Sequence, residues 1–554
     1  MTAPPISSPR PKARRLLGKP ALPALALLLG LSASLAQPAL AEPPASPVSY
    51  EAELCAPPED SLSPTRWLRA TSLAVRGLLP TLEEYQAVAG ADPETLEATV
   101  DQLVDEWLVS DAFADRFVRL HRDLFWNNIL DQRLHAVNVS LAAGNNTTSH
   151  WTRTGTMATR YRGRNVRCLN EPATFGEDGE ILTTPQADGS NREGWVWVTP
   201  YWDPDNPIKV CAFDAQDRLF SANGVACNSN QGLAERDCGC GPNLNWCAAA
   251  PQMDLIQRSF MDDLERRVRE VIFDDRPYLD LFTSTKGWVN GPIVHFLKHQ
   301  SVLTRTRVQP VLTDVSRLPD LPFTAIDTWV EVDLGEHHAG LLTSPSYLLR
   351  FQTDRARANR FYTAFLCQPF NPPAGGLPVA DEASIREPDL QLRDGCSYCH
   401  ALLEPAAAHW GRYSERGMAW LDPRVYPRYD DACATCVRSG LPCPTRCTQN
   451  YVVNPMTDSE SRWLGWLNGY VFRRDEHMRS IEEGPRLLAH RSAVDGRLPR
   501  CTAITAAERL FGEELTEQDE PLIDMLAQHF VGSGFAYREL VKELVMHKTF
   551  RRVR

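Results

Sequence analysis

Two cysteines and a histidine stand together in the segment Cys396-Ser397-Tyr398-Cys399-His400. In this C-x-x-C-H pattern, two thiols three positions apart can reach the two vinyl groups on one edge of a porphyrin, and the adjacent imidazole points at its iron. The pattern predicts one covalently attached c-type haem, with Cys396 and Cys399 as thioether anchors and His400 as the proximal iron ligand. The alternative is a local disulfide or a redox-active cysteine pair beside a structural histidine.

The sixth iron ligand is indicated less strongly by the sequence. Met418 and Met456 follow the motif in the order usual for small cytochromes, and we take Met418 as the candidate distal ligand. Most single methionines fill hydrophobic cores, so this assignment has a plain structural alternative. His409 comes nine positions after His400, on the opposite face of a continuous helix. An empty sixth position would instead permit small-molecule chemistry at the iron.

The chain has fifteen cysteines, which is many for a reducing compartment. If two hold a haem, thirteen remain, and this odd number leaves one thiol free or paired between chains. Two further groups stand out, and we predict disulfides for both, with a metal site as the alternative. They are Cys168, Cys211, Cys227, Cys238, Cys240 and Cys247 in one group, and Cys433, Cys436, Cys443 and Cys447 in the other.

The first 41 residues have the features of a cleaved export signal. A basic stretch from Arg10 to Lys19 precedes an apolar run from Ala21 to Ala36, and Ala39-Leu40-Ala41 follows as a cleavage site. The apolar run has 16 residues, fewer than the roughly 20 that a spanning helix needs. We therefore expect a periplasmic, extracellular or outer-surface protein with no membrane span in the mature chain, exported by the general secretory route although Arg14-Arg15 partly resembles a twin-arginine signal.

Charge and composition narrow the class of partner. The formal charge is -12, and removal of the signal leaves 53 basic against 70 acidic residues, or -17. Such an acidic balance argues against nucleic acid and anionic membranes as main partners. Apolar residues at 43% and charged residues at 23% are typical of folded globular proteins.

Helical periodicity dominates the chain, so the sequence predicts a mainly α, multi-domain helical protein with a cytochrome c-like segment and a disulfide-rich, partly β insertion. The predicted divisions are a signal peptide (1–41), an N-terminal helical domain (42–137), a Cys-rich insertion (138–254), a helical or mixed middle domain (255–334), a haem segment with a Cys-rich tail (335–447) and a C-terminal helical domain (448–554).

Local signals place several of these elements. Thr81 with Glu84 forms a capping box, Asp92-Pro93 marks a second helix start, and Thr516 with Asp519 begins a closing helix pair. Trp195 to Val198 alternates as a short strand would. The apolar stripes expected in the helical core comprise Leu96, Val100, Leu103, Val104, Trp107 and Leu108, then Phe113, Phe117, Leu120 and Leu124, and near the end Leu522, Met525, Leu526, Phe530, Leu540, Leu544 and Val545.

Four stretches resemble the large secreted cytochrome-like proteins of planctomycetes and myxobacteria, which are built from domains of unknown function. They are Leu73 to Thr81 with Glu83-Glu84, Asp274 to Tyr278 with Leu281 and Val289-Asn290, His338 to Thr343 with Leu366 to Phe370 leading to Cys399-His400 and Glu404-Pro405, and Leu510 to Arg554. That family tends to have aspartate and glycine where this chain has Glu404 and Ala407. The resemblance implies an exported cytochrome-like class and no particular substrate.

These observations lead to three functional hypotheses. The first is electron transfer through one haem c to or from a redox partner protein. The second is a haem oxidoreductase with an open iron face. The third is a non-haem, disulfide-stabilised exported scaffold in which Cys396 and Cys399 pair with each other.

Overall fold

The computed structural model describes residues 61–126, 134–144, 149–155, 159–304, 307–372, 375–377 and 381–552. The predicted signal segment 1–41 and Cys55 lie outside these ranges.

Four helices form the N-terminal part: α2 (Pro64–Val75), α3 (Leu82–Ala89), α4 (Leu96–Leu108) and α5 (Asp111–Phe125). The predicted capping box is confirmed, because Thr81 accepts from the Glu84 amide while Glu84 accepts from the Thr81 amide. The helix start predicted at Asp92-Pro93 is wrong by one turn: residues 93–95 form a turn, and α4 begins at Leu96. The expected stripes on α4 and α5 pack into the core, with Val100, Val104, Phe113 and Phe117 fully buried.

The region predicted as a Cys-rich insertion contains short antiparallel strand pairs. They are β1 (Leu141–Ala142) with β2 (Thr152–Arg153), β3 (Thr184–Pro185) with β4 (Asn191–Arg192), and β5 (Trp195–Val198) with β6 (Ile208–Cys211). The predicted strand from Trp195 to Val198 is confirmed, in register Trp195↔Cys211 to Val198↔Ile208. Strands this short bury little apolar area, so the three disulfides Cys168–Cys211, Cys227–Cys238 and Cys240–Cys247 supplement a small core.

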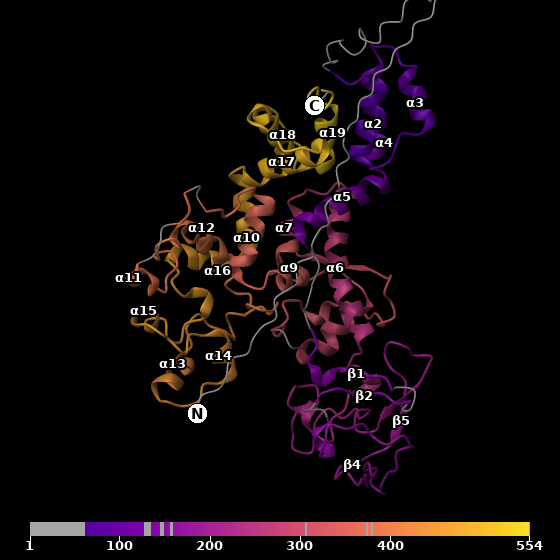
Figure 1. Ribbon diagram of the computed structural model, residues 1–554, viewed down its shortest axis with the longest axis vertical. Helices are drawn as coiled ribbons and strands as arrows, with labels where there is room; N and C mark the ends of the chain where they lie inside the picture. The colour runs from indigo at the N-terminus through magenta and orange to yellow at the C-terminus, as the bar shows by residue number, and fades with distance from the viewer. Residues whose placement is uncertain are drawn as a thin grey trace, which may run out of the picture. The chain divides into compact units, whose positions relative to one another are not determined.

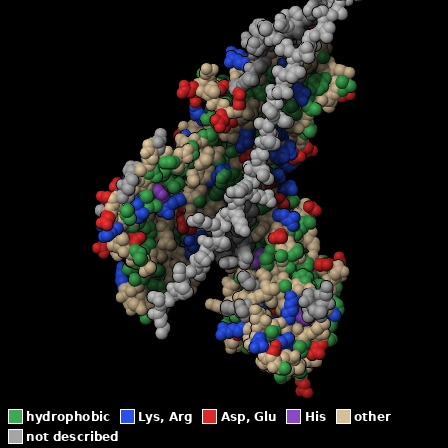
Figure 2. All heavy atoms as spheres, in the orientation of Figure 1, with side chains coloured by type: hydrophobic (Ala, Val, Ile, Leu, Met, Phe, Trp, Pro, Cys, Tyr) green, Lys and Arg blue, Asp and Glu red, His purple; other side chains and the backbone are tan. Residues whose placement is uncertain are grey.

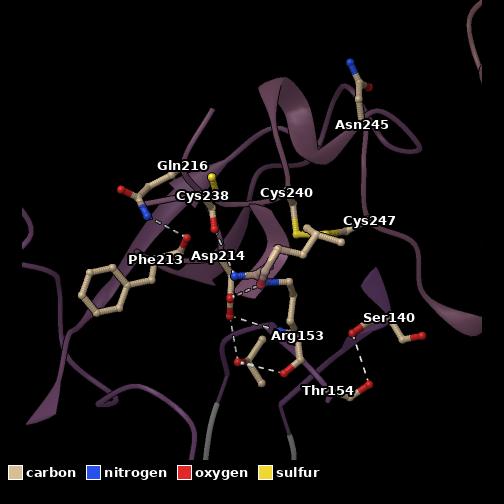
Figure 3. The surroundings of a disulfide bond; sticks show 12 residues. Ser140, Arg153, Thr154, Phe213, Asp214, Gln216, Cys238, Cys240, Asn245 and Cys247 are labelled. Atoms are coloured by element: carbon tan, nitrogen blue, oxygen red, sulfur yellow. Dashed lines mark hydrogen bonds and ion pairs between the residues drawn. A yellow bond between two sulfur atoms is a disulfide. The ribbon is translucent and has the colours of Figure 1, made fainter. Parts of the chain in front are cut away.

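A buried ion pair lies inside this disulfide-rich core. Figure 3 shows Arg153 and Asp214 beside the Cys240–Cys247 disulfide, with the guanidinium Nε 2.8 Å from the Asp214 carboxylate. Arg162 also pairs with Asp214 and with Glu193, and all four side chains are fully buried. Burial favours the neutral acid, yet the charges of Arg162 and Arg153 outweigh it and lower the pKa of Asp214 to about 2.

The middle of the chain is organised around one long helix, α6 (Ala250–Phe273). It packs against α7 (Asp280–Thr283), α8 (Gly291–His295) and β7 (Lys286–Val289), and β7 pairs antiparallel with β8 (Val330–Asp333). Asn290 caps α8 through the Ile293 amide and donates to Ser259 of α6, so this turn is tied to the long helix.

The helices that follow include α12, which carries most of the C-x-x-C-H segment. They are α9 (Pro345–Arg350), α10 (Asp354–Phe365), α11 (Glu382–Ile385), α12 (Ser397–Ala407), α13 (Asp431–Arg438), α14 (Thr445–Asn450), α15 (Asp458–Ser461) and α16 (Asp475–Val494). Figure 1 shows α10, α12 and α16 side by side, and α12 contacts both of the others. Helix α16 is interrupted at Gly484, which has a φ of 71° and precedes Pro485.

Three helices close the chain: α17 (Arg497–Phe511), α18 (Glu520–Gly532) and α19 (Tyr537–Met546). The predicted start of a closing helix pair at Thr516 and Asp519 is confirmed: the two residues form a capping box for a 3-10 turn (Glu517–Asp519) that leads directly into α18. Leu522, Leu526 and Phe530 are buried on α18, and Leu540, Leu544 and Val545 on α19. A disulfide from Cys367, just past α10, to Cys501 of α17 joins this end to the part of the chain that precedes the C-x-x-C-H segment.

The main hydrophobic core is shared by the N-terminal, middle, motif-bearing and C-terminal helices, whereas residues of α13 and α14 belong to a separate, smaller cluster. The fold class is thus mainly helical with a few short strands and several disulfides, as predicted at that level. On the face drawn in Figure 2, acidic and basic side chains are interspersed rather than segregated. Within the described residues, no helix has both the length and the apolar character needed to cross a bilayer.

Candidate functional site

The C-x-x-C-H segment opens helix α12. The chain turns at Asp389, whose carbonyl accepts from Leu392 and Arg393, and Gly395 takes a φ of 74° before Cys396 occupies the N-cap position. Cys399 and His400 then lie in the first turn of the helix. Since residues three and four apart share a helix face, this turn brings the two thiols and the imidazole together.

Cys396 and Cys399 are unpaired and partly exposed. The other cysteines of the described ranges all form disulfides, twelve residues in six bonds. Cys399 Sγ makes one long contact, 3.9 Å to the Phe370 carbonyl oxygen. The two cysteines free for other chemistry are therefore the pair that the sequence singles out.

His400 is oriented by a carboxylate one helical turn further along. Its Nδ1 lies 2.7 Å from Oε1 of Glu404, an i,i+4 pair on α12. An ionised carboxylate can only accept, so Nδ1 donates. No hydrogen bond to Nε2 is found within the described parts of the chain, which leaves that nitrogen available as a ligand. A histidine that binds a metal through one ring nitrogen commonly donates the other N–H to a carboxylate.

Glu404 is in turn held by two arginines. Its side chain is 5% exposed; Arg355 Nε binds Oε1, and Arg473 Nη1 lies 2.8 Å from Oε2 and also donates to the Glu404 carbonyl oxygen. Burial by itself would raise the pKa of Glu404, but the hydrogen bond from Arg355 and the charges of Arg473 and Arg355 lower it below its ordinary value. The acceptor of the His400 proton is therefore a stable carboxylate.

Sequence reasoning missed the role of Glu404, Arg355 and Arg473. The i,i+4 spacing of His400 and Glu404 was a usable signal, because such pairs meet on a helix. Arg355 begins α10 and Arg473 precedes α16, and no local pattern announces that these distant residues converge on α12.

The candidates for the sixth ligand lie in different surroundings. Met418 is 5% exposed and belongs to the main hydrophobic core, where its loop is fixed by backbone bonds to Arg307 and by Arg357 donating to the Gly417 carbonyl. Met456 is 80% exposed. His409 is buried and donates from Nδ1 to the Gly484 carbonyl oxygen, 2.9 Å away. Met418 as an iron ligand stays a prediction.

Large apolar side chains around the motif are exposed to solvent. Leu392, Tyr398 and Leu402 are 64%, 56% and 48% exposed, and Tyr398 and Leu402 are one turn apart on α12. Exposed apolar side chains gathered beside reactive groups mark a surface suited to a ligand or partner. Free thiols, an oriented imidazole and apolar neighbours together fit the residues that a covalent haem requires.

The two further cysteine groups are disulfides, as predicted. In the tail, Cys433 pairs with Cys447 and Cys436 with Cys443, so no four-thiolate site exists there. In the insertion, His150 lies close to Cys168 and Cys211, with ligand atoms within 4.8 Å of one another. The two sulfurs bond to each other, and a disulfide does not supply the thiolates that a metal would need.

Comparisons of the chain with protein-family models, with curated proteins and with solved structures found no match.

Proposed function

We propose that this protein is an exported c-type cytochrome-like electron carrier, with one haem attached through Cys396 and Cys399 and ligated by His400. The observation that carries the proposal is the contrast in cysteine chemistry: twelve described cysteines pair, whereas the C-x-x-C-H pair stays free next to an oriented histidine. The scaffold hypothesis required Cys396 and Cys399 to pair with each other, and that bond is not formed.

Each residue would have a distinct task. The two thiols on the first turn of α12 would anchor the porphyrin edge, and His400 Nε2 would face the iron. Glu404 fixes the ring so that Nδ1 carries the proton, and the arginine pair keeps Glu404 ionised. Bound haem would supply a one-electron centre. The exposed Leu392, Tyr398 and Leu402 offer apolar surface to the macrocycle or to a redox partner protein.

Location and partner follow from the same chemistry. Six disulfides and the predicted signal favour a periplasmic or extracellular site, where covalent haem attachment also takes place. The formal charge of -12 favours a redox partner with a basic contact surface, because opposite charges speed encounter.

Haem attachment can be tested directly. Co-expressed with a cytochrome maturation system, the full chain should retain haem after acid-acetone extraction and give a haem-stained band on a denaturing gel. Cys396→Ala with Cys399→Ala should abolish the stain. The matched control, Cys436→Ala with Cys443→Ala, also removes two cysteines but should keep it, because that pair forms a local disulfide away from the motif.

Absence of stain in the parent chain, or stain that survives the Cys396/Cys399 double substitution, would contradict the proposal. If haem is attached, carbon monoxide binding to the reduced protein separates the electron-carrier hypothesis from the hypothesis of an oxidoreductase with an open iron face. A closed sixth position, as in an electron carrier, gives no carbon monoxide spectrum, whereas an open iron face does.

A further inference from the structure

A cavity of about 300 Å³ lies beyond the arginines that hold Glu404. Arg355 and Arg473 belong to its lining, together with Arg307. Three arginines from separate segments converge here, in a chain whose formal charge is -12. Clustered guanidinium groups in a concave site are the usual means of recognising carboxylates and phosphates.

The arginines keep donors that the protein does not use. The Arg473 side chain is only 7% exposed. Its Nη1 donates to Glu404 and its Nε donates to the Gly469 carbonyl oxygen, while no hydrogen bond from Nη2 is found in the described chain. Arg307 donates Nη1 to the Gln449 carbonyl oxygen at 2.8 Å. Each guanidinium has five N–H groups, so donors remain for a ligand.

The acidic groups near the cavity do not cancel this positive charge. Asp354 lines it, but its carboxylate lies 3.0 Å from the fully buried Arg357. Glu404 offsets one charge of the Arg355 and Arg473 pair. Glu415 also lines the cavity, yet its side chain is exposed to solvent. An excess of positive charge is left for an anion.

The apolar part of the cavity lining favours an organic anion over an inorganic one. Among the apolar lining residues, Leu421 and Leu467 are buried, and the partly exposed Phe472 offers apolar surface that an inorganic oxyanion would leave uncovered. The volume holds roughly ten non-hydrogen atoms, if each takes the roughly 30 Å³ of a water molecule.

We infer that this cavity binds a small organic carboxylate, with its charge on Arg307, Arg355 and Arg473 and its carbon skeleton against Phe472. The ligand would share two arginines with Glu404 and so lie three hydrogen bonds from His400, through an arginine and Glu404. Binding itself does not depend on the proposed haem.

Calorimetry at constant ionic strength tests the inference, with benzoate, succinate and pyruvate as probes. The protein used is the full chain with Cys396→Ser and Cys399→Ser, which cannot attach haem, so failure of the proposed function leaves this experiment intact. At least one carboxylate should bind, neutral benzamide should not, and inorganic phosphate should bind at least tenfold more weakly. No binding of any carboxylate, or equal binding of benzoate and benzamide, would refute the inference.

Variants locate the site. Arg307→Gln should weaken carboxylate binding at least tenfold, whereas Arg424→Gln, an exposed arginine paired with Asp422 outside the cavity, should leave it unchanged. Phe472→Ala provides a second test should Arg307→Gln fail to fold, and it should weaken the bulkier benzoate more than pyruvate. Unchanged affinity in the folded cavity variants would place binding elsewhere and overturn the inference.

Discussion

Glu404 links three charged or polar side chains of the candidate site into one unit. Its carboxylate accepts from His400 Nδ1 and from Arg355 and Arg473. A carboxylate on the far side of an imidazole makes the opposite nitrogen more basic and stabilises the more highly charged state of a bound metal. Its removal should therefore affect redox potential and folding stability together.

Glu404→Gln should raise the midpoint potential of the haem protein by on the order of 60 mV, which is a tenfold change in a one-electron equilibrium. It should also lower the free energy of unfolding by about 3 kcal/mol, because buried Arg473 loses its counter-charge. Glu514→Gln, an exposed residue between α17 and α18, is the matched control. Spectroelectrochemistry and urea unfolding measure the two quantities. An unchanged potential would show that Glu404 does not act through His400.

At the scale of elements, the insertion depends on a charged centre that no single strand could hold. Arg153 is on β2 and Asp214 follows β6, and the two meet inside a core of disulfides and short strands. The pKa of Asp214 is lowered to about 2 from an ordinary 3.8. A lowered carboxyl pKa gives stability that is complete above the ordinary pKa and is lost as pH falls toward the folded value.

The insertion should therefore lose about 2 kcal/mol of stability between pH 4 and pH 2 from this group alone. Asp214→Asn should cost about 3–5 kcal/mol at pH 7, because it leaves Arg153 and Arg162 buried without that charge. The substitution should also reduce the fall in the free energy of unfolding between pH 4 and pH 2. Asp217→Asn, exposed on the same loop, should do neither. Denaturant unfolding from pH 2 to pH 7 measures both effects, and a fall that persists undiminished in Asp214→Asn would contradict the assignment.

At the scale of the whole molecule, one disulfide spans far more chain than the others. Cys367–Cys501 encloses a separation of 134 residues, against 7 for Cys436–Cys443. In the chain-entropy treatment the longer loop constrains the unfolded state by about 5 kcal/mol and the shorter by about 2–3 kcal/mol. Cys367→Ser with Cys501→Ser should thus destabilise the protein by about twice as much as Cys436→Ser with Cys443→Ser in urea unfolding. An equal loss of stability would mean that local packing, and not loop closure, determines how much each disulfide stabilises the protein.

Much of the local structure could be predicted from the sequence because its determinants are local. The Thr81–Glu84 capping box, the α4 and α5 stripes and the Trp195–Val198 strand each depend on residues within one or two turns. The start of α4 was misplaced because a proline suits a turn as well as a first helical position.

The parts that could not be predicted depend on residues distant in the chain. Arg355 and Arg473 reach Glu404 across separations of 49 and 69 residues, and Cys367 reaches Cys501 across 134. The placement of two thiols and an imidazole on one helical turn depends on five consecutive residues, whereas the supporting arginines and the neighbouring cavity follow from the packing of α10 and α16 around α12.

If the chain is exported N-terminus first, as proposed, the Cys367–Cys501 bond also sets an order of events during translocation. Cys367 enters the oxidising side well before Cys501, and the thiols nearest to it in sequence during that interval are Cys396 and Cys399. A thiolate exchanges with whichever disulfide or oxidant it meets first. Maturation then requires either that Cys396 and Cys399 react with haem early or that a thiol reductase releases them from a disulfide with Cys367. The yield of correctly assembled protein would depend on the relative rates of these reactions during translocation.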